Sequence, residues 1–173
     1  MVDSNEISSL AVLPFENSKP NDTTNSWVAT TMRDEIRIRL GALNDLTVKT
    51  GYETLNEAGG TAEEMAAKLK VDALITGSFL MHQGQLQFRV FLLNAATGSE
   101  TAFDPHEGKE TEILDLQKKA ALGIANRIRT DISNRERNEI AREKDIRPDA
   151  YIALREGLTQ LDAYTAEGFA RAI

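Results

Sequence analysis

The sequence predicts an α/β fold: a mixed sheet of four or five strands, with helices mainly on one face and a helical hairpin at the C-terminus. In the first half, apolar segments of strand length alternate with amphipathic segments of helix length, which is typical of parallel strands joined by helices. In the second half, two strand-like segments are separated only by His82, Gln83 and Gly84, a spacing that indicates an antiparallel hairpin. The expected order is strand-helix-strand-helix-strand-strand-helix.

The first predicted strand, residues 10–13, reads Leu-Ala-Val-Leu. A continuous apolar run of this length is typical of a strand buried on both faces, so we expect it in the centre of the sheet. Pro14 has no amide hydrogen to donate to a neighbouring strand, so the strand should end there. A polar loop over residues 18–26 then leads to a helix.

The next elements follow from the spacing of apolar side chains. The first helix carries a stripe at helical spacing, formed by Val28, Met32, Ile36, Leu40 and Leu43. A later helix opens with Thr61 and has Glu64 three residues on, which is the sequence of a capping box. The predicted ranges are a helix over 27–43, a strand over 46–50, a short helical turn over 52–58 and a helix over 61–69.

Two longer strands follow, over residues 72–81 and 85–93. In the second, polar and apolar side chains alternate, so one side of the sheet should pack on helices while the other is wet. The side chains expected to pack are Leu86, Phe88, Val90 and Leu92. A fifth, edge strand over 99–103, a loop over 104–108 and a long helix over 111–133 complete the predicted domain.

Charge density rises sharply over residues 134–147, which indicates a solvated helical linker. Pro148 suits the first turn of a new helix. The sequence therefore predicts a disordered leader over residues 1–7, an α/β domain over 8–133, a charged linker over 134–147 and a helical unit over 148–173.

Composition excludes several classes of function. With 27 acidic and 20 basic residues the net charge is −7, which disfavours nucleic acid and anionic membrane surfaces as partners. The chain contains no cysteine, so disulfides, thiolate nucleophiles and cysteine metal sites are excluded. No apolar segment approaches the length of a membrane span, so we expect no direct membrane insertion.

No residue pattern indicates catalysis. His82 falls in the predicted hairpin turn and His106 in a loop, and neither has a second ligand at a metal-binding spacing. No serine lies in a nucleophile elbow, and adjacent carboxylates on a helix point apart. We therefore expect no enzyme activity, no catalytic residue, no metal and no cofactor.

The order of several segments resembles the bacterial TolB-like domain family over residues 9–132. The matching segments are residues 11–17 (AVLPFEN), 69–78 (LKVDALITGS), 85–93, the turn 94–98 (NAATG) and 114–117 (LDLQ). The C-terminal residues 148–173 resemble the start of a tetratricopeptide repeat. The resemblance implies a module of a multidomain bacterial signalling protein, in its periplasmic or extracytoplasmic part, with the cytoplasm as the alternative.

Two sets of candidate site residues follow. The loop after the first strand lies where open α/β sheets tend to bind ligands, so Phe15, Glu16, Asn17 and Trp27 are candidates for a small ligand. The truncated repeat would leave apolar side chains without a neighbouring helix, which makes them candidates for protein contacts. These are Tyr151, Leu154, Leu158, Leu161 and Phe169.

The predicted function is a non-catalytic protein-interaction or sensory module. Its partners would be proteins, including a second copy of the chain paired through the C-terminal helices. The alternative is a small-ligand-binding domain that regulates an upstream adenylate cyclase, kinase or DNA-binding domain.

Overall fold

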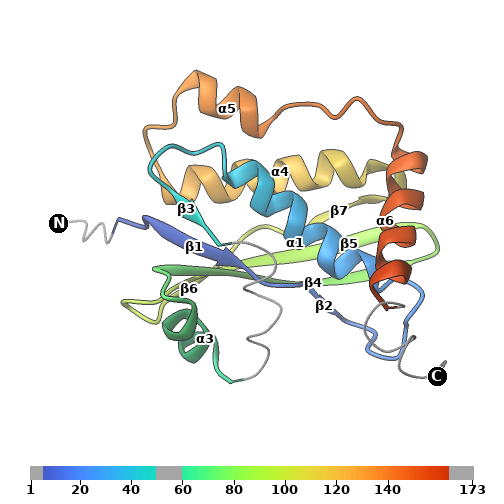
Figure 1. Ribbon diagram of the computed structural model, residues 1–173, viewed down its shortest axis with the longest axis horizontal. Helices are drawn as coiled ribbons and strands as arrows, with labels where there is room; N and C mark the ends of the chain where they lie inside the picture. Colours follow the sequence, from blue (N-terminus) through green and yellow to red (C-terminus); the bar gives the residue numbers. More distant parts are fainter. Residues whose placement is uncertain (1–5, 50–59, 164–173) are drawn as a thin grey trace.

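The computed structural model describes residues 6–49 and 60–163 (Figure 1). The predicted fold class is confirmed, because helices pack on a single mixed sheet. The strands are β1 (Ser9–Val12), β2 (Glu16–Asn17), β3 (Thr47–Val48), β4 (Ala73–His82), β5 (Gln85–Asn94), β6 (Glu100–Ala102) and β7 (His106–Lys109). The helices are α1 (Trp27–Leu40), α3 (Ala62–Leu69), α4 (Ile113–Ile128), α5 (Asn134–Ile140) and α6 (Pro148–Ala163), with a 3-10 turn η1 (Glu110–Glu112) before α4. The turn predicted over 52–58 lies outside the described residues.

The strand order is β3-β1-β4-β5-β6. Strand β1 runs parallel to both β3 and β4, so its predicted central position is confirmed. Strands β4 and β5 form the predicted antiparallel hairpin. Its two turn residues, Gln83 and Gly84, both have positive φ angles, 49° and 73°, as the tight turns that match the twist of a hairpin require.

We predicted that the first strand ends at Pro14 and therefore did not predict β2. Pro14 only interrupts the pairing with β4. Val12 pairs with Ile75 and Glu16 pairs with Ser78, so one more residue lies on the first chain segment than on β4 between these pairs. The extra residue makes a bulge at Pro14 and Phe15. Beyond the bulge, the chain pairs again with the second half of β4.

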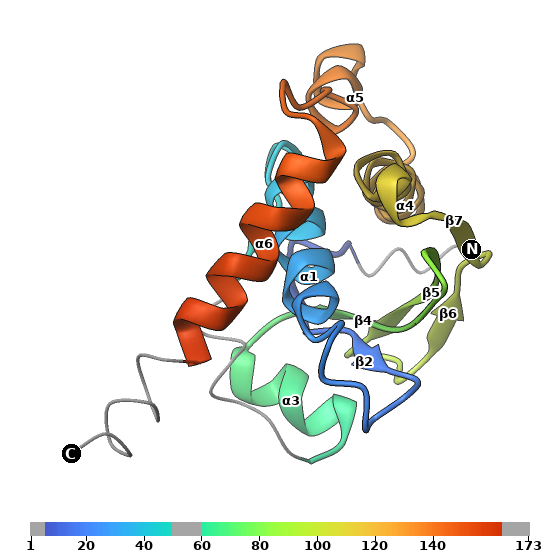
Figure 2. The same ribbon diagram turned by 90° about the vertical axis from the view of Figure 1, so that its right-hand side faces the viewer.

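The two faces of the sheet bury separate clusters of side chains. Leu10 and Val12 face α1 and α4, whereas Ala11 and Leu13 join Leu69 of α3 in a smaller cluster. This alternation follows from the two-residue period of a strand. Figures 1 and 2 show α3 on the opposite side of the sheet from α1 and α4. Most helical cover is therefore on one face, as predicted.

Local sequence patterns predicted some helix ends correctly and others incorrectly. The capping box of α3 is present: Glu64 N donates to Thr61 Oγ1 over 3.2 Å, and Thr61 N donates to Glu64 Oε2 over 2.9 Å. The long helix predicted over 111–133 is confirmed as α4, but its predicted end is wrong, because α4 ends at Ile128 and Arg129 is extended. At the sheet edge, the predicted strand near Thr101 is confirmed as β6, but the loop predicted over 104–108 contains β7.

The charged segment 134–147 is helical only over α5. Ser133 and Glu136 cap this helix with a second capping box, which sequence reasoning missed. Hydrogen bonds from Ser133 and from Asn44 lower the pKa of Glu136 to about 2. Ile140 at the end of α5 is buried in the main core, and so is Ile7, which we expected in a disordered leader. The segment thus packs on the domain.

The carboxylate of Asp72 aligns the starts of β1 and β4. Its Oδ2 accepts four hydrogen bonds of 2.9–3.0 Å, from the backbone N and side-chain Oγ of Ser8 and of Ser9. Burial raises the pKa of Asp72, but the bonds from Ser8 and Ser9 outweigh it, so the net pKa lies below the ordinary 3.8. The charged form is therefore the one that holds the two strands in register.

Replacing Asp72 with asparagine should lower the free energy of unfolding by about 1–2 kcal/mol at neutral pH, because a charged acceptor is lost. A lowered folded-state pKa stabilises the fold above pH ~4, and this contribution disappears as the pH falls through the folded-state pKa. Urea unfolding at several pH values, with exposed Asp131→Asn as the control, measures the difference. A difference that persists unchanged at pH ~2 would contradict the assignment.

Candidate functional site

The four residues predicted to bind a ligand are divided between core and surface. Phe15 is buried and packs edge-on against Phe88, with 6.2 Å between ring centroids. Trp27, the first residue of α1, is also buried. Glu16 is exposed and Asn17 is half-buried in β2. Both aromatic side chains thus have a packing role, while ligand binding by these four residues stays a prediction.

The loop between β2 and α1 is closed by its own hydrogen bonds. Asn17 donates to the carbonyl of Asp22 over 3.0 Å and accepts from Lys19 N over 2.9 Å. The Asp22 carboxylate accepts from Thr24 N over 3.0 Å and from Asn25 Nδ2 over 2.7 Å. The bond from Asn25 is the main cause that lowers the pKa of Asp22. Asn17 and Asp22 therefore direct their hydrogen bonds into the loop itself, whereas the buried Nε1 of Trp27 has no hydrogen-bond partner among the described residues.

This loop also touches the C-terminal helix. A cavity of about 280 Å³ lies between them, and Trp27 is one of its lining residues. The other lining residues are Thr23, Thr24 and Ser26 of the loop and Glu156, Thr159 and Gln160 of α6. The loop and α6 thus form one continuous surface.

Helix α6 packs across the outer side of α1 (Figure 2). The side chains that it turns toward the domain are Tyr151, Arg155 and Thr159, which lie one turn apart. Tyr151 is 5% exposed and belongs to the main core. Ile152 also packs against the main core, so the docked side of α6 combines two polar side chains with a tyrosine and an isoleucine.

Arg155 makes the most specific contact between α6 and α1. Its Nε donates to Thr31 Oγ1 over 2.8 Å, and its NH2 group pairs with Asp34 Oδ2 over 2.9 Å. Asp34 also pairs with Arg33 over 2.8 Å. The guanidinium of Arg155 is thereby held at two points.

Glu35 is the second link between α1 and the C-terminal segment. Its buried carboxylate pairs with Arg39 Nε over 2.8 Å and with Lys144 Nζ over 2.9 Å. Arg39 in turn donates to the carbonyls of Ile140, over 2.6 Å, and Arg142, over 3.0 Å. We call Thr31, Asp34, Glu35, Lys144, Tyr151 and Arg155 the polar seam.

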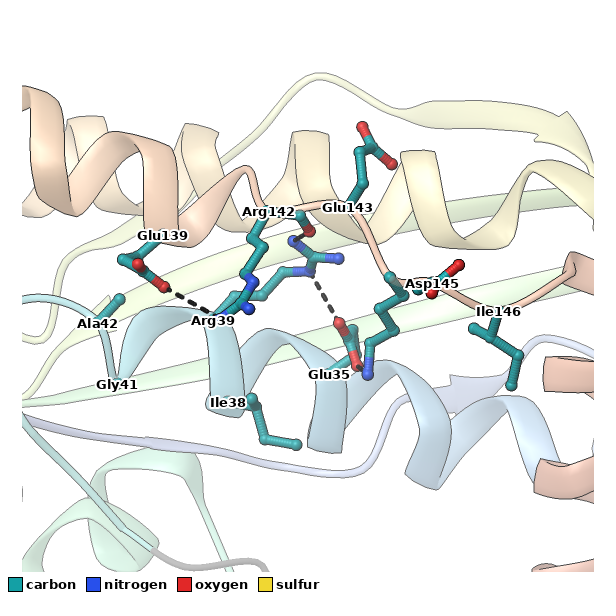
Figure 3. Close-up of a pocket in the computed structure, with 11 residues that line it drawn as sticks. Glu35, Ile38, Arg39, Gly41, Ala42, Glu139, Arg142, Glu143, Asp145 and Ile146 are labelled. Carbon is teal, nitrogen blue, oxygen red and sulfur yellow. Dashed lines mark hydrogen bonds and ion pairs between the residues drawn. The ribbon is translucent and has the colours of Figure 1, made fainter.

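A groove of about 660 Å³ lies beside this seam, between α1 and residues 139–146. Figure 3 shows the Arg39 side chain beneath the connecting segment, with Glu35 alongside. The groove mixes acidic and basic side chains, and its most exposed ion pair, Arg142 with Glu139, is long at 3.8 Å. Most of its charged side chains thus already pair with opposite charges of the same chain.

Tyr151 is enclosed by the seam. Burial, followed by the nearby charge of Glu35, raises the pKa of Tyr151 to about 12. The ammonium of Lys144 lies 5.6 Å from the ring centroid, within the range of a cation–π contact. Tyr151 therefore anchors α6 and is not part of an exposed surface, contrary to its predicted role in partner contacts.

Three exposed leucines form one face of α6, which we call the outer face. Leu154, Leu158 and Leu161 are 53%, 41% and 58% exposed, and their spacing places them on one side of the helix. Phe169, the remaining residue of the predicted contact set, lies outside the described residues. Helix α6 thus leaves these three leucines exposed on a flank beside its docked side.

The seam was not predicted because its partners are far apart in the sequence: Arg155 and Thr31 are separated by 124 positions. A weaker signal was present, since Tyr151, Arg155 and Thr159 fall one helical turn apart. Within residues 6–49 and 60–163, no group of three or more His, Asp or Glu side chains is arranged to hold a metal. No helix in the same ranges is long and apolar enough to cross a membrane.

No family model matches the sequence, and neither does any curated protein. Among solved structures, lipoprotein GNA1162 from Neisseria meningitidis is similar, with 19% identity, a TM-score of 0.47, and coverage of 69% of this chain and 97% of that chain. TolB from Acinetobacter baumannii is 10% identical, with a TM-score of 0.49 and coverage of 75% of this chain and 30% of that chain. The C-terminal domain of LpoB from Salmonella enterica is 14% identical, with a TM-score of 0.39 and coverage of 61% of this chain and 84% of that chain. Identities this low leave activity and partners open.

The second helix of the predicted repeat would begin beyond residue 163, outside the described residues. The repeat, the domain boundaries and the extracytoplasmic location stay predictions.

Proposed function

We propose that this chain is a non-catalytic protein-interaction module, and that the outer face of α6 is its contact surface. The observation that carries the proposal is the row of exposed leucines along α6. An amphipathic helix normally buries its apolar side, whereas here Leu154, Leu158 and Leu161 face solvent. A helix held in this way is suited to packing against a second protein.

The stripe has the dimensions of a helix-binding surface. From Leu154 to Leu161 it spans roughly 10 Å, at about 1.5 Å per residue. Exposed leucines at this spacing match the apolar face of a second helix. Arg155 and Tyr151 hold the backbone beneath them, so the leucines are presented from a fixed base, which reduces the entropy lost on binding.

The test places a photoreactive amino acid at Leu158 and, as a control, at Ile38, which is 56% exposed on α1. Proteins crosslinked from Leu158 in the native cell, and not from Ile38, are candidate partners. Each is then purified and titrated with the wild-type chain, Leu158→Arg and Ile38→Arg.

Leu158→Arg should weaken partner binding by at least about tenfold, because a contact leucine near the centre of an interface contributes on the order of 1.4 kcal/mol or more. Ile38→Arg should leave affinity within about twofold. Unchanged melting temperatures for both variants show that the fold is intact. Equal crosslinking from both positions, or equal affinity of Leu158→Arg and wild type, would remove α6 as the contact surface.

A further inference from the structure

The joint between α6 and the domain differs in chemistry from the rest of the core. Helices α1 and α4 meet through apolar side chains such as Met32, Ile36 and Ile124. Helix α6 places Tyr151 and Ile152 against that core, but its specific contact with α1 is polar, because Arg155 pairs with Asp34. Just before α6, Lys144 pairs with Glu35. The two kinds of contact respond differently to separation in water.

Separating an apolar contact exposes hydrocarbon to water and is unfavourable in proportion to area. Separating ion pairs returns the charged groups to water, and the recovered hydration offsets much of the lost attraction. Arg155 and Asp34 are already about one-fifth exposed, so water reaches them readily. The polar part of this joint is therefore easier to separate in water than an apolar contact of equal area.

The segment just before α6 has the position of a hinge between this helix and the domain. Upstream, Arg39 holds the carbonyls of Ile140 and Arg142, and Lys118 of α4 contacts Glu143. Downstream, α6 begins at Pro148 as one continuous helix. Residues 144–147 lie between these points and outside any helix. Within them, Lys144 belongs to the seam and Ile146 packs against the core, so this segment is released only when the seam opens.

We propose that α6 undocks from the domain as a unit, by opening the polar seam and turning about residues 144–147, while the sheet, α1 and α4 stay folded. When α6 is docked, its leucines have a fixed orientation relative to the domain. When α6 is undocked, they adopt many orientations. The importance of this motion for partner binding rests on the proposed function, but the motion itself does not. Raising the salt concentration screens the ion pairs and shifts the equilibrium toward the undocked state.

The experiment is hydrogen exchange of the full chain, read by mass spectrometry, in about 0.05 M and about 1 M sodium chloride, a range over which the Debye length falls severalfold. A helix of this length is marginal once it is detached, so undocking appears as faster exchange over 148–163. We expect at least about a tenfold increase at high salt, since weakening the seam by ~1.4 kcal/mol shifts an equilibrium tenfold. Helix α3, which packs through apolar Leu69, is the internal reference and should not change.

Two variants isolate the seam. Arg155→Gln should exchange rapidly over 148–163 already at low salt and lose most of the salt effect. Arg135→Gln makes the same chemical change at an exposed position of α5 and should behave like wild type. Exchange of α6 that matches the core strands β4 and β5 at both salt concentrations, or that is equal in the two variants, would overturn the proposal. Neither outcome depends on a partner, so failure here is separate from failure of Leu158→Arg to weaken binding.

Discussion

Replacing Val12 with aspartate should unfold the domain under conditions in which the wild type is stable. Val12 is fully buried in β1, which is the central parallel strand between β3 and β4. A carboxylate there has no partner and no water, which destabilises a fold by about 3–5 kcal/mol. That is a large part of the ~5–15 kcal/mol that stabilises a typical domain.

Urea and thermal unfolding measure this effect, with Ile38→Asp as the matched control. Ile38 is also an aliphatic residue, but its side chain is mostly exposed, so its replacement should change the free energy of unfolding by less than ~0.5 kcal/mol. A melting temperature for Val12→Asp within a degree or two of wild type would contradict the central position of β1.

Gly77→Ala should be the most damaging single-methyl addition in the chain's sheet, because β4 has no room for a Cβ atom at this position. A Cβ built on Gly77 would lie 2.6 Å from the carbonyl oxygen of Arg89 and 2.7 Å from Cδ2 of Phe15. One contact is backbone and the other is a buried ring, so neither moves freely. Overpacking of this kind is destabilising by about 1–3 kcal/mol or more, measurable by urea unfolding.

Gly157→Ala provides a control with the opposite sign. A Cβ on Gly157 meets no atom within 4 Å, and alanine is favoured over glycine inside a helix by about 1 kcal/mol. The same substitution should therefore destabilise the chain in β4 and stabilise α6. A Gly77→Ala variant as stable as wild type would show that Phe15 does not pack over Gly77 as the structure places it.

Local sequence signals were sufficient where the structure depends on neighbouring residues. The hairpin at Gln83 and Gly84, the capping box of Thr61 and Glu64, and the alternation along β5 each depend on a short segment, and each is confirmed. The end of α4 was misplaced because apolar spacing continues past Ile128 to Ile132 although the backbone becomes extended at Arg129. Periodicity alone does not register such a change in direction.

Features that depend on contacts between residues far apart in the sequence could not be predicted from local patterns. Strand β2 exists because β4 continues past the bulge, and β7 exists because β5 extends far enough to pair with it. The polar seam depends on Arg155 and Thr31 meeting across the fold. Burial of Tyr151 in that seam changes its role from contact residue to anchor.

The short strands at the edge of the sheet influence how the molecule meets other molecules. An exposed sheet edge can recruit a strand from another chain, which is a route to aggregation. The outer edge of the ten-residue strand β5 is covered by two short strands, β6 and β7, with Phe103, Asp104 and Pro105 breaking the line between them. Exposed Glu100 and Glu107 add charge along it. Growth of the sheet into a neighbouring molecule is discouraged here, which leaves helical surfaces as the more favourable route to association.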